Sequence, residues 1–278
     1  QLEKNKPNLS AWKKVVKRKI KPSKSVNVSF VGKYVDLKDA YFSLTEALDH
    51  AGITNDTKVN INFVSSDELN NKNYSSKLKK SDAILVPGGF GGRGIEGMIL
   101  AAKYAREKKV PYFGICLGLQ IAIIEIARNL CGLKDANSTE FKSRTKHKVI
   151  SLITEWKNED GSIEKRDKNS DKGGTMRLGA QKAKLKKNSL AHKLYKKTNI
   201  FERHRHRYEV NPEYVSELEK KGLLISARSE IHNLVEIIGM KDHPWYLGCQ
   251  FHPEFTSKPK TGHPLFNDFI KTAVKLKR

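Results

Sequence analysis

The sequence predicts an α/β fold in which a mostly parallel central sheet is covered by helices and extended by antiparallel strands. Short apolar runs alternate with amphipathic helical patterns through the first half of the chain, which is the pattern of repeated strand–helix units. The strands expected near the C-terminus have no helical pattern between them, which indicates antiparallel returns. With 278 residues and 38% hydrophobic content, the chain can bury one large core.

Each element of the first half follows from a local pattern. Apolar runs predict strands over 26–32, 58–64, 83–86 and 110–115, and helical spacing of apolar residues predicts helices over 39–51, 96–108 and 119–130. The strand over 58–64 alternates apolar and polar residues, whereas those over 83–86 and 110–115 are short apolar runs. Continuous apolar strands are typical of a parallel sheet that is buried on both faces.

Beyond Cys131 the sequence becomes polar, charged and rich in turn-forming residues. It predicts a strand over 149–154, a loop over 157–174, strands over 223–227, 234–240 and 246–251, and a C-terminal helix over 266–276. Residues 1–25 carry nine Lys or Arg against one acidic residue, which is typical of a linker. We therefore expect a basic linker over 1–25 and one domain over 26–278.

A cysteine stands where a strand is expected to turn into a helix. Gly114, Cys116 and Gly118 form G-x-C-x-G, the thiol version of the G-x-S-x-G turn that presents a nucleophile. The two glycines leave room for strand and helix to cross closely, and the helix that begins near Leu117 directs its free N–H groups at the sulfur. This placement favours a reactive thiolate, although a cysteine in an apolar strand is more commonly an ordinary core residue.

A thiol nucleophile needs a base, and the base needs a group that orients it. His252 and Glu254 follow the strand predicted over 246–251 and lie two residues apart, about 130 residues after the cysteine. At the end of a buried strand, both side chains would point the same way. An isolated H-x-E is a weak signal, but together with the elbow it predicts a Cys116–His252–Glu254 triad.

Gly-Ile-Cys-Leu-Gly at 114–118 and Phe-His-Pro-Glu at 251–254 together resemble the class I glutamine amidotransferases, which hydrolyse glutamine to glutamate and ammonia. Further segments resemble one branch of that family, the CTP synthases. These segments are Val-Gly-Lys-Tyr at 31–34, Asp-Ala-Tyr at 39–41, Val-Pro-Gly-Gly-Phe-Gly at 86–91, Asn-Ser-Thr-Glu-Phe at 137–141, Gly-Thr-Met-Arg-Leu-Gly-Ala at 174–180, Glu-Arg-His-Arg-His-Arg-Tyr-Glu-Val-Asn at 202–211 and His-Pro-Trp at 243–245. The resemblance runs from about residue 26 to about residue 273, and in CTP synthases this part is the C-terminal glutaminase domain.

The resemblance implies roles for residues outside the triad. The backbone N–H groups of Gly89 and Leu117 would form the oxyanion hole, and both residues would also contact glutamine. Gln120, Glu140 and Arg207 would complete the glutamine site, with Glu140 at the α-ammonium and Arg207 at the α-carboxylate. Judged without the resemblance, Glu140 is more simply a surface acid.

The resemblance also implies a larger enzyme, in which an N-terminal synthetase domain of the same polypeptide uses the ammonia to aminate UTP to CTP. ATP and Mg²⁺ are expected only on that domain, so we expect neither a cofactor nor a metal on this chain. GTP would activate the full enzyme allosterically, and Arg93 is the candidate residue for a GTP-responsive loop. The full enzyme is expected to be a cytoplasmic homotetramer.

Two other patterns permit different interpretations. Residues 89–94 satisfy G-x-G-x-x-G, but the motif does not follow the first strand and no acidic residue ends a strand about 20 residues later, so a dinucleotide site is disfavoured. A loop whose N–H groups face an anion or oxyanion is the better interpretation. Alternating Arg and His over 203–207 is compatible with a phosphate clamp or a solvated ladder, whereas guanidinium groups on either side oppose a bound metal cation.

The net charge of +23 would by itself indicate a polyanionic partner such as nucleic acid. The lysine-rich runs, however, lack the interleaved aromatic residues of single-strand binders and the zinc or helix-turn-helix patterns of duplex readers, so we do not expect nucleic-acid binding. No signal peptide and no 18-residue apolar stretch is evident, so neither secretion nor membrane insertion is expected.

Three cysteines, an odd number, argue against a disulfide framework and favour a reducing compartment. Two alternatives to a glutaminase domain of CTP synthase remain at this stage. One is another class I amidotransferase or a related cysteine hydrolase, and the other is a non-catalytic polyanion-binding or scaffold module that retains an inert elbow.

Overall fold

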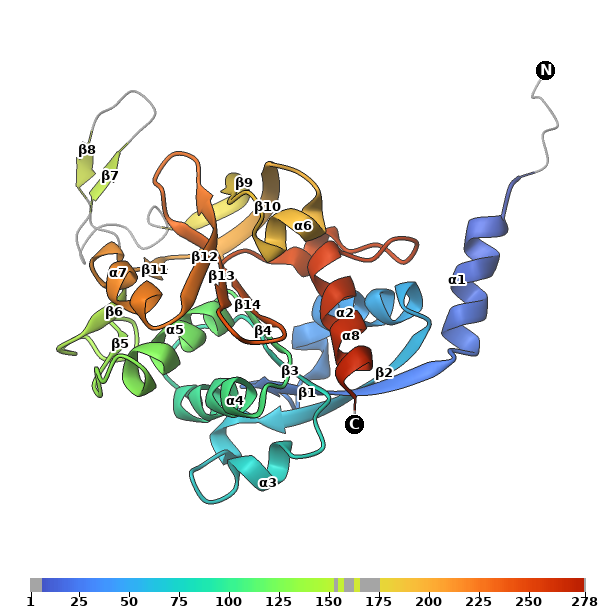
Figure 1. The fold of residues 1–278 in the computed structure, drawn as a ribbon, viewed down its shortest axis with the longest axis horizontal. Helices are drawn as coiled ribbons and strands as arrows, with labels where there is room; N and C mark the ends of the chain where they lie inside the picture. Colours follow the sequence, from blue (N-terminus) through green and yellow to red (C-terminus); the bar gives the residue numbers. More distant parts are fainter. Residues whose placement is uncertain (1–6, 153–154, 158–162, 166–175, 278) are drawn as a thin grey trace.

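A nine-stranded mixed sheet runs through the middle of the molecule in the order β10-β9-β12-β13-β14-β4-β3-β1-β2 (Figure 1). The computed structural model describes residues 7–152, 155–157, 163–165 and 176–277. The parallel half of the sheet consists of β1 (Lys24–Gly32), β2 (Thr57–Ser65), β3 (Ala83–Val86), β4 (Tyr112–Ile115) and β14 (Tyr246–Cys249). Since β3, β4 and β14 are buried at every position, they form the centre of a sheet covered on both faces.

The remaining strands of this sheet are antiparallel. They are β13 (Val235–Met240), β12 (Leu223–Ser229), β9 (Arg177–Leu185) and, at the edge, β10 (Asn199–His206). The predicted fold class, a parallel sheet with an antiparallel extension, is therefore confirmed. The sequence did not predict β9 or β10, and its strand over 246–251 was two residues too long. The chain leaves β14 after Cys249 because the N–H group of His252 bonds to the Arg203 carbonyl, at 2.8 Å, on β10.

Helices cover both faces of the sheet (Figure 1). One face is covered by α2 (Phe42–Thr54), α6 (Leu190–Tyr195) and α8 (Pro264–Leu276), and the other by α3 (Tyr74–Leu78), α4 (Ile95–Lys108), α5 (Leu117–Asn129) and α7 (Pro212–Lys220). Three short 3₁₀ turns, η1 (Lys38–Tyr41), η2 (Ser66–Glu68) and η3 (Pro253–Thr256), join these elements. The four predicted helices correspond to α2, α4, α5 and α8.

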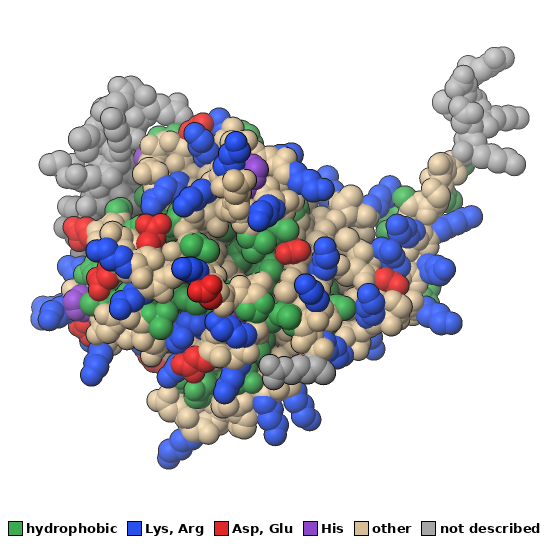
Figure 2. Space-filling model, in the orientation of Figure 1, with side chains coloured by type: hydrophobic (Ala, Val, Ile, Leu, Met, Phe, Trp, Pro, Cys, Tyr) green, Lys and Arg blue, Asp and Glu red, His purple; other side chains and the backbone are tan. Residues whose placement is uncertain are grey.

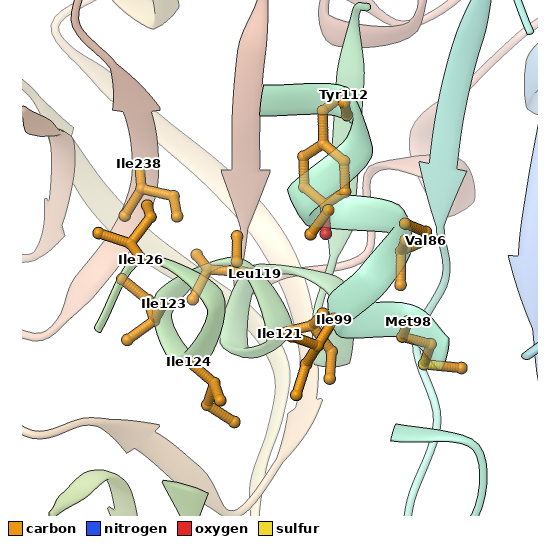
Figure 3. Close-up of a cluster of buried hydrophobic side chains, with 14 of the residues drawn as sticks. Val86, Met98, Ile99, Tyr112, Leu119, Ile121, Ile123, Ile124, Ile126 and Ile238 are labelled. Atoms are coloured by element: carbon orange, nitrogen blue, oxygen red, sulfur yellow. The ribbon is translucent and has the colours of Figure 1, made fainter. Parts of the chain in front are cut away.

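The helix α5 is buried along almost its whole length and lies at the centre of one core. Figure 3 shows its isoleucines packed between Ile99 of α4 and Ile238 of β13. Every residue from Leu117 to Ala127 is buried. A helix that is buried on all sides is held in place by its neighbours, so its first turn, beside Cys116, has a fixed position.

Two smaller sheets lie beside the main one. The first joins β5 (Asn137–Ser138), β6 (Lys148–Leu152) and β11 (Tyr208–Val210), and the second is an antiparallel pair of β7 (Glu155–Lys157) and β8 (Ile163–Lys165). The loop predicted over 157–174 is wrong at β8, because pairing with β7 satisfies the backbone groups of both segments. Residues 158–162 and 166–174 of that loop, and 153–154 of the strand predicted over 149–154, lie outside the described residues.

The basic N-terminal segment contains a helix, α1 (Ser10–Ile20), which its composition did not indicate. Arg18 donates hydrogen bonds to the carbonyl groups of Ile53 and Thr54, which connects α1 to the end of α2. The apolar side chains of Trp12 and Val16 are about half exposed. The division into a linker over 1–25 and a domain over 26–278 stays a prediction, with β1 beginning at Lys24.

The nucleophile elbow depends on a close crossing between β4 and α5. A Cβ atom on Gly114 would stand 2.5 Å from the backbone of Gly118, and a Cβ atom on Gly118 would stand 2.2 Å from the carbonyl oxygen of Val86 on β3. Both distances are too short for a carbon atom, and the obstructing atoms belong to the backbone. Only glycine therefore permits β3, β4 and α5 to approach as they do.

We predict that Gly118→Ala lowers the free energy of unfolding by about 1–3 kcal/mol, because overpacking against Val86 outweighs the helix propensity of alanine. Urea unfolding monitored by circular dichroism measures this. Gly92→Ala is the matched control, since its Cβ would meet nothing closer than 3.7 Å. Equal stability of the two variants would contradict the crossing argument.

Candidate active site

Cys116 occupies a strained position between β4 and α5. Its backbone has φ 52° and ψ −99°, in a region that non-glycine residues rarely adopt, and it caps the N-terminus of α5. The N–H group of Cys116 bonds to the carbonyl oxygen of Cys249 at 2.7 Å, which fixes the elbow to the end of β14. The side chain is 3% exposed. This is the geometry of a nucleophile elbow.

Three neighbouring parallel strands bring the elements of the site together. The order β14-β4-β3 places His252, Cys116 and the loop after Val86 at the same edge of the sheet. Gly88 lies against the side chains of both His252 and Cys116, because a Cβ there would stand 2.9 Å from Cε1 of His252 and 3.5 Å from Cβ of Cys116. In parallel sheets the carboxyl ends of adjacent strands form the usual binding edge.

His252 is positioned as the partner of the cysteine. Its Nδ1 lies 2.8 Å from Oε1 of Glu254, which is on η3 rather than on an extended strand. Burial opposes the charge on the imidazole, but the Cys116 thiolate and the Glu254 carboxylate outweigh it and raise the pKa of His252 from 6.5 to about 10. The site therefore favours a charged imidazolium beside the sulfur, oriented by a carboxylate.

A small pocket lies beside the sulfur. All five residues predicted for glutamine binding line it together with the predicted nucleophile: Gly89, Cys116, Leu117, Gln120, Glu140 and Arg207. Gly89 and Leu117 are adjacent, since a Cβ on Gly89 would stand 3.3 Å from Cδ2 of Leu117. The structure thus brings together residues from α5 and from the segments that follow β3, β5 and β10, whereas their roles stay predictions.

Glu140 is tied to the loop after β3. Its Oε1 accepts a hydrogen bond of 2.7 Å from the N–H group of Gly91. Burial raises the pKa of Glu140, against the opposing effects of Gly91 and of nearby Lys33. The carboxylate is half-buried and lines the pocket, so it is not the simple surface acid that the sequence alone allows.

Lys33 is a site residue that the sequence did not single out. Its side chain is buried, and its Nζ donates to the carbonyl of Phe90, at 2.9 Å, and to that of Gly91. Burial lowers the pKa of Lys33 from 10.5 to about 8, although Glu140 opposes this shift. The lysine stood within a family-like segment, but no local pattern indicated that it would be buried beneath the glycine loop.

Arg93 lies outside the pocket. It donates to the carbonyl of Lys33 at 2.8 Å, approaches Asp67 at 3.5 Å and stacks over the ring of Tyr34 at 5.1 Å. Its side chain is more than half exposed. The candidate GTP-responsive residue is therefore at the rim of the glycine loop rather than among the groups around the sulfur.

The alternating Arg and His residues form the edge strand β10. The histidines point inward, where His204 contacts Glu236 at 2.8 Å and His206 contacts Glu209 at 2.6 Å. Arg177 donates to both glutamates, to Glu209 at 2.9 Å and to Glu236 at 2.6 Å. The solvated-ladder interpretation is wrong for the histidines, because both are buried and each contacts a glutamate inside the protein.

The described residues contain no group of three or more His, Cys, Asp or Glu side chains that could hold a metal ion. In the same residues, none of the helices is both long enough and apolar enough to span a membrane. Lys and Arg side chains are spread over the visible face and interrupted by apolar and acidic side chains (Figure 2).

The fold and the elbow–histidine–carboxylate site define a class of protein. The sequence model described as "Glutamine amidotransferase class-I" matches residues 36–272, and the chain belongs to this family. At a finer level, the chain is similar to the solved "Trypanosoma brucei CTPS - glutaminase domain with bound acivicin", with 38% identity over 90% of this chain and 94% of that one and a TM-score of 0.80.

Two more distant solved structures also match. A glutamine amidotransferase from Methylobacillus flagellatus is 11% identical over 84% of this chain and 71% of that one, with a TM-score of 0.46. Another, from Thermotoga maritima, is 9% identical over 91% of this chain and 99% of that one, also with a TM-score of 0.46. Neither adds to the assignment.

We predict that the pKa of His252 falls well below 10 in Cys116→Ala, because the thiolate that outweighs burial is then gone. A folded-state pKa above the unfolded value of 6.5 means that this imidazolium stabilises the fold fully below pH 6.5 and loses the effect as pH rises through about 10. NMR titration of ¹³C-labelled histidines measures both proteins, with His252→Gln to assign the signal. An unchanged pKa would show that the sulfur is not its charged partner.

Proposed function

We propose that this chain is the glutaminase domain of a CTP synthase, hydrolysing glutamine to glutamate and to ammonia for the amination of UTP. The observation that carries the proposal is geometric: a strained elbow cysteine lies close to His252, which Glu254 orients, and it borders a pocket lined by the residues expected to hold glutamine. The 38% identity to a CTPS glutaminase domain supports the more specific assignment. That related domain was solved with acivicin bound.

In the first half of the proposed reaction, the thiolate of Cys116 attacks the Cδ carbon of glutamine, and the carbonyl electrons move onto oxygen. The N–H groups of Gly89 and Leu117 stabilise that oxyanion, which is where preorganised donors contribute most to catalysis. As the tetrahedral intermediate collapses, the C–N bond breaks and His252 gives its proton to the departing nitrogen. Ammonia leaves, and a γ-glutamyl thioester remains on the cysteine.

In the second half, neutral His252 removes a proton from water as the water oxygen attacks the thioester carbonyl. The same oxyanion donors stabilise the second intermediate, and collapse breaks the C–S bond to release glutamate and the thiolate. Glu254 keeps Nδ1 of His252 engaged, so that Nε2 is the nitrogen that exchanges the proton. The histidine ends the cycle charged, as it began.

Three further side chains that line the pocket would orient the substrate. We propose that Glu140 binds the α-ammonium, that Gln120 contacts the substrate from the first turn of α5, and that Arg207 holds the α-carboxylate. Gly91 fixes one oxygen of Glu140. A guanidinium suits the carboxylate because its two parallel N–H donors match the two oxygens.

The remaining parts of the proposal concern the full enzyme. They are a basic linker over 1–25 that joins a synthetase domain, ATP and Mg²⁺ bound only on that domain, allosteric activation by GTP, a homotetramer and a cytoplasmic location. Arg93 is the proposed GTP-responsive residue. Arg93 contacts Lys33 and Asp67, so a movement of Arg93 at the rim would be transmitted to the glycine loop.

Glutamate release from glutamine, measured with and without GTP, tests the proposal. Wild type should release glutamate, and Cys116→Ala should fall to the background rate because the nucleophile is absent. Cys131→Ala is the matched control, since Cys131 lies beyond α5 and outside the pocket. A wild type that is inactive under both conditions, or an active Cys116→Ala, would contradict the proposal.

We predict that Arg207→Lys raises the KM for glutamine roughly ten- to a hundredfold, which corresponds to the loss of one charge-assisted contact. Lysine keeps the charge but not the paired donors. The effect on kcat should be smaller than that of Cys116→Ala. Steady-state kinetics decide this, and a KM within twofold of wild type would remove Arg207 from the substrate site.

A further inference from the structure

The sulfur of Cys116 has an amide neighbour that the triad does not include. Nε2 of Gln250 lies 3.8 Å from the sulfur, within reach of a long N–H···S contact. Gln250 is completely buried. Its backbone N–H bonds to the carbonyl of Glu236 at 2.9 Å, so the residue is held where the chain leaves β14.

The orientation of this amide follows from its second contact. Nε2 of Gln120 donates to the carbonyl of Tyr208 at 2.9 Å and to Oε1 of Gln250 at 3.4 Å. Because the amide nitrogen of Gln120 can only donate, Gln250 presents its oxygen to Gln120 and its NH₂ group to the sulfur. Tyr208, Gln120, Gln250 and Cys116 therefore form a buried hydrogen-bonded chain, which we call the amide relay.

The two protonation states of the sulfur have different partners. The carbonyl of Arg205, 3.9 Å from the sulfur, can accept a hydrogen bond only from the thiol. The amide of Gln250 can donate to the thiolate, and a hydrogen bond to the charged form favours that form. The amide of Gln250 and the positively charged His252 therefore both favour the thiolate.

We propose that Gln250 is a positioning residue that holds the Cys116 sulfur in its thiolate form and on the pocket side, with Gln120 fixing its orientation. The inference rests on the proposed function only in taking Cys116 as the nucleophile. Gln120 then has two roles, since the amide that is proposed to contact glutamine also fixes the orientation of the Gln250 amide.

The rate of Cys116 alkylation by iodoacetamide, measured against pH by mass spectrometry without glutamine, tests the relay. In Gln250→Met, which keeps length but has no amide, the alkylation profile should move to higher pH by about one unit. In Gln250→Glu the shift should be at least as large, because the sulfur then faces an acceptor or a negative charge. Glutaminase kcat should fall by about tenfold with the KM for glutamine within twofold of wild type.

Cys249→Ala is the matched control, because Cys249 is the buried neighbour of Gln250 and its own sulfur contacts Phe251. It should leave the profile of Cys116 in place. The other groups that could move the profile are His252 with Glu254 on η3, Cys249 on β14, and Glu140, His206, Arg207 and Tyr208 around the pocket. None of them is changed in the Gln250 variants.

A Gln250→Met profile that overlays wild type, or one that shifts no more than that of Cys249→Ala, would overturn the proposal. If Gln250→Met does not fold, Gln120→Met provides the second test, since it should shift the profile in the same direction by releasing Gln250. An unshifted profile in a folded Gln120→Met would overturn it equally. Alkylation does not require catalytic turnover. A negative glutaminase assay would therefore contradict the proposed function without deciding the test of Gln250.

Discussion

The crossing of β4 and α5 is the constraint on which the site depends. Gly114 and Gly118 have no room for a Cβ atom, so the elbow can form only where two glycines flank the cysteine at this spacing. The crossing forces Cys116 to φ 52°, and the strain is held by a helix buried along its length and by a backbone bond to Cys249. The same bond places the exit of β14 beside the sulfur. A short turn after β14 is then enough to bring His252 to the sulfur, and the 3₁₀ turn η3 places Glu254 next to His252.

The chemistry follows from charges held close together at a buried edge of the sheet. His252 has a high pKa because a thiolate and a carboxylate face it, and burial, which normally prevents such a charge, is outweighed. Lys33 shows the opposite balance, since burial dominates there and lowers its pKa to about 8. Its ammonium nevertheless bonds to Phe90 and Gly91, so the loop that contains the proposed oxyanion donor is held from below. In both cases the backbone places the group and its neighbours determine its charge.

The parts that the sequence could predict are those whose signal is local. The strands β3 and β4 are visible in the sequence as apolar runs because both of their faces are buried. The elbow is visible as a characteristic spacing of glycines around the cysteine. The strand β10 was missed because three of its four inward residues are Glu202, His204 and His206, which become core residues only through their partners in the folded protein. The alternation of Arg and His with a period of two was the available signal. Lys33 and Gln250 gave no such signal, since their burial results from the packing of separate segments around them.

The buried charges beneath β10 have a consequence for the pocket. Arg177 joins Glu209 to Glu236, and the two histidines complete the network, so a shift of β10 by one residue would bury arginines and expose the paired histidines. A buried ion pair is by itself weak evidence for stability. Removing one partner, however, typically destabilises the folded state by about 3–5 kcal/mol, so the wrong register of β10 is strongly disfavoured. Register in turn decides that the Arg205 carbonyl faces the sulfur and that Arg207 faces the pocket. The polar interior of this strand is thus what keeps the proposed substrate-binding arginine in place.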